Sequence, residues 1–187
     1  MTDYTVIESP NYRVRIINDP YAGDPWIDDE VWHLASWSSR IPGENHNWDT
    51  PAEFAQDMQD TAIYFPIYAY VHSGIVLSTS PFSDPWDSSH IGYAYITREK
   101  ITEIWDWEKI TRQRREKLLE DLKQSLNVLN AWLNGECFGF ILEKKTRCNL
   151  NEIHYEEVDS CWGFYGDDPR ENGMTCYWPD ELKKEAI

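Results

Sequence analysis

The sequence predicts an α+β fold in which a mostly antiparallel sheet of about five to seven strands carries helices packed on one side. Two kinds of pattern lead to this prediction. Segments 62–79 and 138–158 each show strand patterns on both sides of a turn, which is typical of β-hairpins. Segment 111–134 has leucines at helical spacing and stops at Gly135, which is typical of a long helix with one buried face.

The first sixty residues predict one strand and one helix. In segment 5–17, apolar residues alternate with Arg13 and Arg15, as on a strand with one buried face. Segment 26–34 mixes acids with aromatic residues and fits either a short helix or an irregular strand. Thr50 then begins the capping-box sequence TPAE, with proline at the first helical position, so a helix is expected from there.

The middle of the chain is expected to form a hairpin, a long rigid loop and a third strand. Apolar and aromatic residues alternate over 62–71, and a glycine-containing turn precedes the β-branched segment 75–79. The loop 80–92 contains two prolines, which restrict its backbone, and Trp86, which is expected to pin it against a core. The third strand is predicted at 93–96.

The remaining elements are helices and a second hairpin. Thr97 is the expected N-cap of a short helix that precedes the long one. Residues 138–145 and 153–158 are expected to pair as a hairpin, and the ordered body is expected to end near residue 168. A last short helix is predicted at 179–184.

The net charge of −16 is distributed unevenly along what the chain length predicts to be a single domain, residues 1–187. Residues 1–60 form an acidic region of charge −9, residues 61–150 a neutral hairpin and helix core, and residues 151–187 an acidic region of charge −7. A surface of this sign repels phosphates, so direct nucleic-acid binding is not expected. It attracts basic surfaces, including the nucleic-acid channels of other proteins, although acidity also serves solubility alone.

Neither a membrane segment nor a metal motif is evident in the sequence. No apolar run is long enough to span a bilayer, and the N-terminus lacks the pattern of a signal peptide, so we expect a cytoplasmic protein without a membrane partner. The four cysteines form no C-x-x-C pair. Neither disulfides nor a zinc site is therefore predicted, and no cofactor is expected.

Residues suited to chemistry gather around the central loop, where His72 and His90 flank Asp84 and Asp87. A histidine near carboxylates can act as a general base or a metal ligand. The alternative is that His72 is a turn residue and that both aspartates cap the loop by accepting hydrogen bonds from backbone N–H groups.

A second candidate pair for chemistry is His154 and Cys161. Cys161 lies in an apolar aromatic run and is expected to be a small buried residue. The chain also lacks a phosphate-binding glycine loop, an HExxH motif and a G-x-S-x-G motif. We therefore expect that the protein is not an enzyme, and assign no catalytic, cofactor-binding or metal residues.

Three segments carry a wider resemblance: FPIYAYVHSGIVLSTSPFSDPWDSSHIGYAYIT, NAWLNGECFGF and EEVDSCWGFYGDD. They resemble an uncharacterised family encoded by bacteriophages and mobile elements, whose members share an HSG turn, a CPWDSG-type loop and a DSCWGFYG-type ending. The loop departs from that pattern, with Ser83 and Asp84 near the usual cysteine and Ser88-Ser89 in place of Ser-Gly. The resemblance implies a phage context and carries no assigned activity.

A phage context and an acidic, aromatic-rich surface together favour a phage-encoded inhibitor of a host nucleic-acid-handling defence protein, of the anti-CRISPR or anti-restriction type. In the host cytoplasm it would occupy the nucleic-acid-binding groove of a defence nuclease, with carboxylates in place of phosphates and aromatic rings as anchors. The predicted protein-binding residues are Asp24, Trp26, Asp28, Asp29, Glu30, Trp32, Glu152, Glu156, Glu157 and Asp159.

Two alternative functions stay open. One is a small phage accessory enzyme that uses His72, Asp84 and Asp87, and the other is a structural or regulatory phage protein. Exposed aromatic residues would also favour a homodimer.

Overall fold

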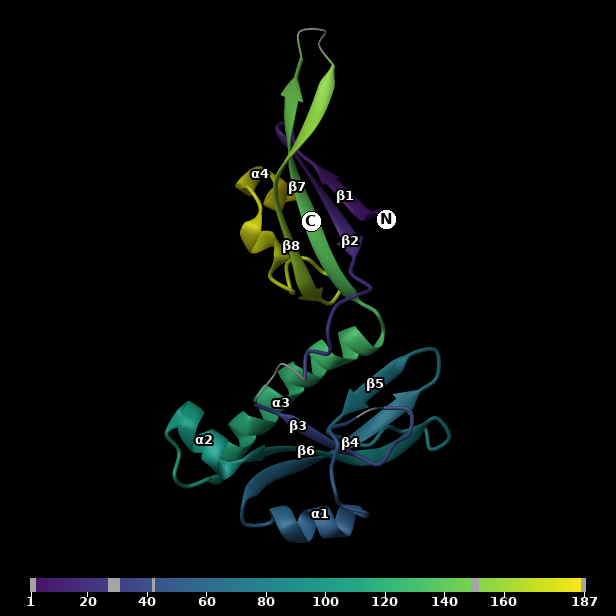
Figure 1. The fold of residues 1–187 in the computed structure, drawn as a ribbon, viewed down its shortest axis with the longest axis vertical. Coiled ribbons are helices and arrows are strands. Elements are labelled where there is room, and N and C mark those ends of the chain that lie inside the picture. The colour runs from purple at the N-terminus through teal and green to yellow at the C-terminus, as the bar shows by residue number, and fades with distance from the viewer. Residues whose placement is uncertain (1–2, 27–30, 42, 149–151, 186–187) are drawn as a thin grey trace. The chain divides into compact units, whose positions relative to one another are not determined.

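The computed structural model describes residues 3–26, 31–41, 43–148 and 152–185. The chain forms two compact units, the first from Met1–Gly23 with Ala131–Ile187 and the second from Asp24–Asn130 (Figure 1). This division differs from the single domain that the chain length predicts, and the charge boundaries at residues 60 and 150 fall inside the units. Both units combine helices with an antiparallel sheet, so the predicted α+β class is confirmed.

The first unit contains a four-stranded antiparallel sheet in the order β1-β2-β7-β8. Its elements are β1 (Asp3–Glu8), β2 (Tyr12–Asn18), β7 (Cys137–Arg147), β8 (Ile153–Tyr165), the 3₁₀ helix η1 (Met174–Tyr177) and α4 (Asp180–Glu185). The predicted second hairpin is present as β7 and β8. Strand β8 is longer than expected, because its pairing with β7 continues as far as Tyr165.

One face of this sheet forms the core of the first unit. Alternate apolar residues of β2 and β7 pack against side chains from the C-terminal segment. The core comprises Val14, Ile16, Phe138, Phe140, Leu142, Phe164, Met174, Trp178 and Leu182. The expectation that the ordered body ends near residue 168 is therefore wrong, because Met174, Trp178 and Leu182 cover apolar surface that the sheet would otherwise expose to water.

The second unit contains a four-stranded antiparallel sheet in the order β3-β6-β4-β5. Its strands are β3 (His33–Ser36), β4 (Ala62–Val71), β5 (Ile75–Ser78) and β6 (Ser88–Thr97). Its helices are α1 (Pro51–Met58), α2 (Arg98–Trp105) and α3 (Arg112–Leu133), the last of which continues beyond Asn130.

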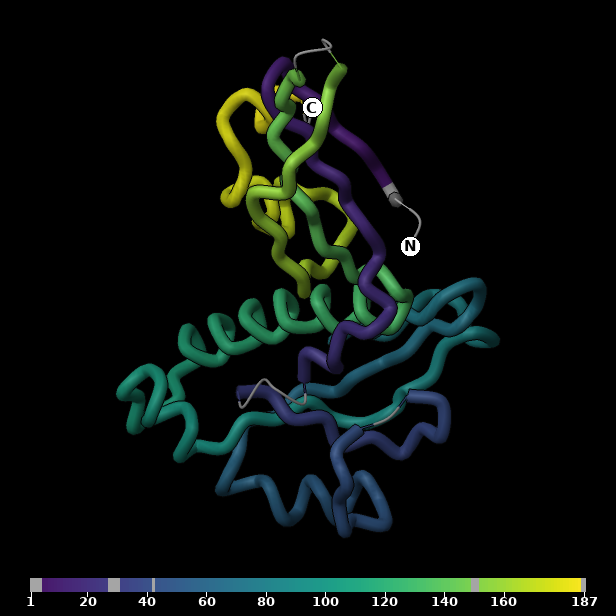
Figure 2. Tube along the Cα trace, turned by 45° about the horizontal axis from the view of Figure 1, so that its top comes forward, coloured from purple at the N-terminus to yellow at the C-terminus, as the bar shows by residue number. Residues whose placement is uncertain are grey.

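Helices lie against both faces of this second sheet (Figure 2). On one face, Phe54 of α1 stacks on Tyr93 with ring centroids 5.2 Å apart. On the other, the guanidinium of Arg115 in α3 lies 4.6 Å from the ring centroid of Phe65. The alternation along β4 and β6 places tyrosines such as Tyr64 and Tyr93 on the face that contacts α1, and apolar residues such as Phe65 on the face that contacts α3.

The predicted N-cap residues Thr50 and Thr97 begin α1 and α2 as expected. Thr50 Oγ1 accepts a hydrogen bond from the Glu53 backbone at 3.2 Å, and Thr97 Oγ1 accepts one from the Lys100 backbone at 3.1 Å. The central loop is shorter than expected, because β6 begins at Ser88. Trp86 does not pin this loop to a core, because its side chain is 93% exposed.

Candidate functional site

Two tryptophans predicted as binding anchors lie in the core of the second unit. Trp26 is 8% exposed and Trp32 is fully buried. Nε1 of Trp26 donates to the Ser125 carbonyl at 3.2 Å, and Nε1 of Trp32 donates to Oδ2 of Asp121 at 2.8 Å. The prediction of Trp26 and Trp32 as protein-binding residues is therefore wrong. Their large rings stabilise the core, and their only polar groups are satisfied there.

Of the carboxylates predicted to form a binding surface around these tryptophans, the structure describes only Asp24. Asp24 is half-buried, and its Oδ1 accepts a hydrogen bond from the Trp26 backbone N–H at 2.8 Å. Such a bond closes a local turn. The predicted residues Asp28, Asp29 and Glu30 lie outside the described residues. The N-terminal half of the predicted binding surface is therefore represented by a single carboxylate that already has a structural role.

The predicted acids of the C-terminal half gather on β8. Glu152 comes directly before this strand, Glu156, Glu157 and Asp159 lie within it, and all four are exposed. Exposed apolar side chains are interleaved with them, namely Ile153, Tyr155, Val158 and Trp162. Strand β8 is an edge of its sheet, so one side of its backbone has no partner strand among the described residues. We call this strand, with Glu152, the acidic edge.

The register sends these carboxylates to both faces of the sheet. Glu157 lies opposite Glu143, and Glu156 lies opposite Lys144. Because neighbouring residues in a strand point to opposite faces, Glu156 and Glu157 project in opposite directions. The acidic character thus follows the exposed edge of β8 and is not confined to one flat face.

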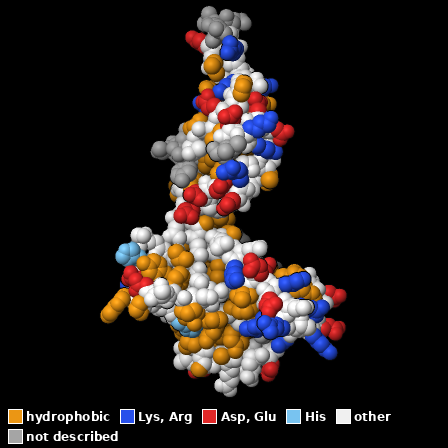
Figure 3. Space-filling model, turned by 180° about the vertical axis from the view of Figure 1, so that it is seen from behind, with side chains coloured by type: hydrophobic (Ala, Val, Ile, Leu, Met, Phe, Trp, Pro, Cys, Tyr) orange, Lys and Arg blue, Asp and Glu red, His pale blue; other side chains and the backbone are white. Residues whose placement is uncertain are grey.

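Acidic and basic side chains are interspersed on the face of the first unit shown in Figure 3, and several of the bases are paired within the sheet. Glu143 is buried and accepts a hydrogen bond from Nε of Arg13 at 2.6 Å, while Nε of Arg15 lies 3.4 Å away. The hydrogen bond to Glu143 raises the pKa of Arg13. The guanidinium of Arg13 also lies 3.4 Å from the centroid of the Tyr155 ring, which orients that ring of the acidic edge.

Lys145 is paired in a similar way. Its Nζ lies 2.8 Å from Oε2 of Glu8, and this hydrogen bond lowers the pKa of Glu8. By contrast, Glu156 and Glu157 form no ion pair with any residue that the structure describes. The unpaired charge of β8 itself is therefore negative.

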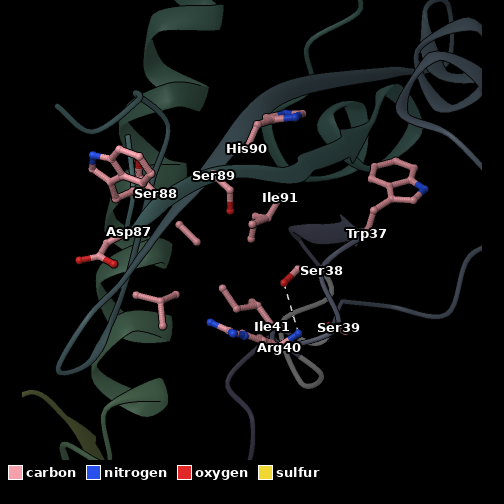
Figure 4. A pocket seen from close by; sticks show the side chains of 13 residues that line it. Trp37, Ser38, Ser39, Arg40, Ile41, Asp87, Ser88, Ser89, His90 and Ile91 are labelled. Carbon is pink, nitrogen blue, oxygen red and sulfur yellow. Dashed lines mark hydrogen bonds between the residues drawn. The ribbon is translucent and has the colours of Figure 1, made fainter. Parts of the chain in front are cut away.

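The second unit has a pocket of about 450 Å³ between segment 37–41 and the start of β6 (Figure 4). Its lining is mainly polar and includes Ser38, Arg40, Asp87, Ser89 and His90. Its size suits a small ligand.

Of the central-loop residues suited to chemistry, the structure pairs His72 with Asp87 but gives Asp84 a separate role. Nδ1 of His72 lies 2.9 Å from Oδ2 of Asp87, but His72 does not line the pocket. Oδ1 of Asp84 accepts hydrogen bonds from the backbone N–H groups of Trp86 at 2.8 Å and Asp87 at 3.4 Å. Asp84 is therefore a loop-capping residue, which is the structural alternative that the sequence offers.

His154 and Cys161 do not form a pair. Both belong to β8, where an offset of seven positions places them about 23 Å apart along an extended strand. The structure instead brings Cys148 and Glu152 to His154, and one ligand atom from each lies within 4.8 Å of the other two. The spacing C-x₃-E-x-H brings these groups together only across a hairpin, so the register of β7 and β8 was needed to find this cluster.

Comparisons of the chain with protein-family models, curated proteins and solved structures find no match. No helix within the described ranges has the length and apolar character needed to cross a membrane. The fold and the surface thus define an α+β protein with an acidic, partly apolar edge strand.

Proposed function

We propose that this protein is a phage-encoded inhibitor that binds a host nucleic-acid-handling defence protein, of the anti-CRISPR or anti-restriction type, in the host cytoplasm. The observation that carries the proposal is the acidic edge, where exposed carboxylates and exposed apolar side chains share one edge strand. The expected partner surface is the basic groove in which a nuclease holds nucleic acid.

The chemistry of the acidic edge supports this proposal in two ways. Its carboxylates complement a groove built for phosphates, and such complementarity speeds association and selects the partner. Its apolar residues Ile153, Tyr155, Val158 and Trp162 supply the desolvated contacts that carry most of the affinity in protein interfaces. The edge of β8 that does not face β7 can also pair with an exposed strand of the partner.

The test is DNA cleavage by purified CRISPR effectors and restriction endonucleases, measured with and without this protein. We expect inhibition of at least one such nuclease. The inhibition should weaken steeply between low and moderate salt, and a higher concentration of substrate DNA should relieve it, because DNA and this protein would use the same basic groove.

Charge reversal of the acidic edge should weaken this inhibition. The triple variant Glu156→Lys, Glu157→Lys and Asp159→Lys is expected to raise the concentration needed for half-inhibition by about tenfold or more, since about 1.4 kcal/mol of lost complementarity has that effect. The matched control is Asp60→Lys, Glu108→Lys and Glu185→Lys, which makes the same charge change at exposed positions elsewhere. An equal loss in both variants, or inhibition that salt does not affect, would reject a role for the acidic edge.

The His72–Asp87 hydrogen bond supports a second candidate function, that of a small accessory enzyme. With Nδ1 directed to Asp87, Nε2 of His72 is left to accept a proton, as in a general base oriented by a carboxylate. We expect His72→Ala to lower hydrolysis of chromogenic esters or phosphodiesters by about 10²-fold or more. The control is His33→Ala, which removes a histidine that is also paired with a carboxylate, that of Glu44. Absent hydrolysis by the unaltered protein, or equal rates in all three proteins, would reject this candidate.

A further inference from the structure

The end of the β7–β8 hairpin brings together three side chains of the kinds that bind transition metals. Thr146 pairs with His154 and Arg147 with Ile153, and the Cys148 backbone N–H donates to the Glu152 carbonyl at 3.1 Å. Since every second residue of a strand points to the same face, Cys148, Glu152 and His154 share one face of the hairpin.

The distances suit a single ion. The Cys148 sulfur, a carboxylate oxygen of Glu152 and a ring nitrogen of His154 all lie within 4.8 Å of one another. Zinc bound at usual lengths by sulfur, nitrogen and oxygen in a tetrahedron needs donor separations of about 3.3 to 3.8 Å. Changes of side-chain rotamer are sufficient to close that difference, because Glu152 and His154 are exposed and Cys148 is only half-buried.

The set of donors indicates which metal would bind. A thiolate and an imidazole favour zinc and similar transition metals, whereas magnesium and calcium prefer oxygen ligands alone. Cys137, by comparison, is a poor ligand, because burial raises the pKa of its thiol to about 11. Glu156 lies on the same face as His154, two residues along β8, where its carboxylate can orient the imidazole.

We propose that Cys148, Glu152 and His154 form a zinc-binding site at the end of the β7–β8 hairpin. Three protein ligands leave the fourth tetrahedral position for a water molecule. Cys148 directly follows β7, Glu152 directly precedes β8 and His154 lies in β8, so the bound ion would cross-link the two arms of the hairpin and stabilise their pairing. This site shares Glu152 and His154 with the acidic edge, but zinc binding does not depend on the inhibitory function proposed for that edge.

The experiment is a titration of the full chain, without a polyhistidine tag and with a non-thiol reductant, using Co²⁺ as a spectroscopic probe for zinc. We expect one Co²⁺ per chain, with thiolate-to-cobalt charge-transfer absorption that Zn²⁺ abolishes. Cys148→Ser should remove this absorption, and Glu152→Ala and His154→Ala should each weaken binding by about tenfold or more. These positions are exposed or half-buried, so circular dichroism should show unchanged folding.

Cys176→Ser is the matched control, because Cys176 is an exposed cysteine of η1 in the same unit. It should bind Co²⁺ as the unaltered protein does. The proposal is overturned if the unaltered protein shows no thiolate absorption or if Cys148→Ser retains it. Loss of absorption in the Cys176 variant, or unchanged affinity in the His154 variant, would overturn it as well.

Discussion

Replacing Gly92 by alanine should destabilise the second unit by about 3 kcal/mol, at the upper end of what overpacking usually costs. A Cβ atom at Gly92 would lie 1.9 Å from the Ala35 carbonyl oxygen and 3.0 Å from Cα of Ser36. Both contacts are with backbone, so no side-chain rotation can relieve them. The added methyl group must instead push β3 away from β6.

Moving β3 is costly because this short edge strand is fixed to β6 and packs into the core. Leu34 and Ala35 are buried, and the Trp37 backbone N–H donates to the Ile91 carbonyl at 2.9 Å just beyond the strand. Separation of the strands would break ladder hydrogen bonds and expose these apolar side chains to water. Urea unfolding followed by circular dichroism measures the effect as a lower midpoint.

Gly139→Ala is the matched control for this effect. A Cβ atom there would lie 2.2 Å from the ring of Trp162, but that residue is 41% exposed and its side chain can rotate away. The nearest backbone atom is the Cys161 carbonyl oxygen at 2.9 Å, a milder contact than the 1.9 Å at Gly92. We expect a smaller loss than for Gly92→Ala, and partial recovery when Trp162→Ala is added. A loss at Gly139 equal to that at Gly92, or a Gly92→Ala protein as stable as the unaltered one, would contradict the argument.

Trp32→Ala should lower the free energy of unfolding by about 3 to 5 kcal/mol, the range measured for removal of a buried tryptophan or phenylalanine. Trp32 is fully buried and packs against Phe65 with ring centroids 6.1 Å apart. Its removal leaves a cavity in the core and deprives Asp121 of an indole donor at 2.8 Å. Urea unfolding followed by circular dichroism avoids the change in fluorescence that loss of a tryptophan causes.

Trp32→Phe separates the contribution of ring packing from that of the indole hydrogen bond to Asp121. It keeps most of the ring and removes the N–H group, so we expect a loss of about 1 to 2 kcal/mol. Inhibition of a nuclease should be unchanged in Trp32→Phe at temperatures where the protein is folded, because Trp32 belongs to the core. Normal stability with lost binding would instead restore Trp32 as a binding anchor.

Much of the fold was predictable from local sequence. The alternation over 62–71 appears as β4, the leucine pattern as α3, and Thr50 and Thr97 cap their helices as expected. These features depend on neighbours within a few residues, which a sequence shows directly. The polar residues 88–92 predict a loop, whereas in the structure they belong to β6, whose pairing with β4 is a contact between distant parts of the chain.

The candidate sites likewise include features that local sequence predicts and features that depend on distant residues. The acidic edge was predictable, because a run with four carboxylates is visible in the sequence. The burial of Trp26 and Trp32 was not, because their partners Ser125 and Asp121 are about ninety or more residues away along the chain. Because Trp26 and Trp32 lie next to acidic residues in the sequence, the sequence wrongly predicts both side chains at the surface.

The sequence by itself determined the helix caps, the hairpins, the α+β class and the acidic character of residues 152–159, because each follows from composition and periodicity over a short window. Only the tertiary structure decided that the strands form two sheets, that the C-terminal segment completes the core of the first, and that Cys148, Glu152 and His154 meet. Those outcomes depend on strand register and on which apolar faces cover one another. Both are set by contacts between residues distant in sequence, which local patterns do not specify.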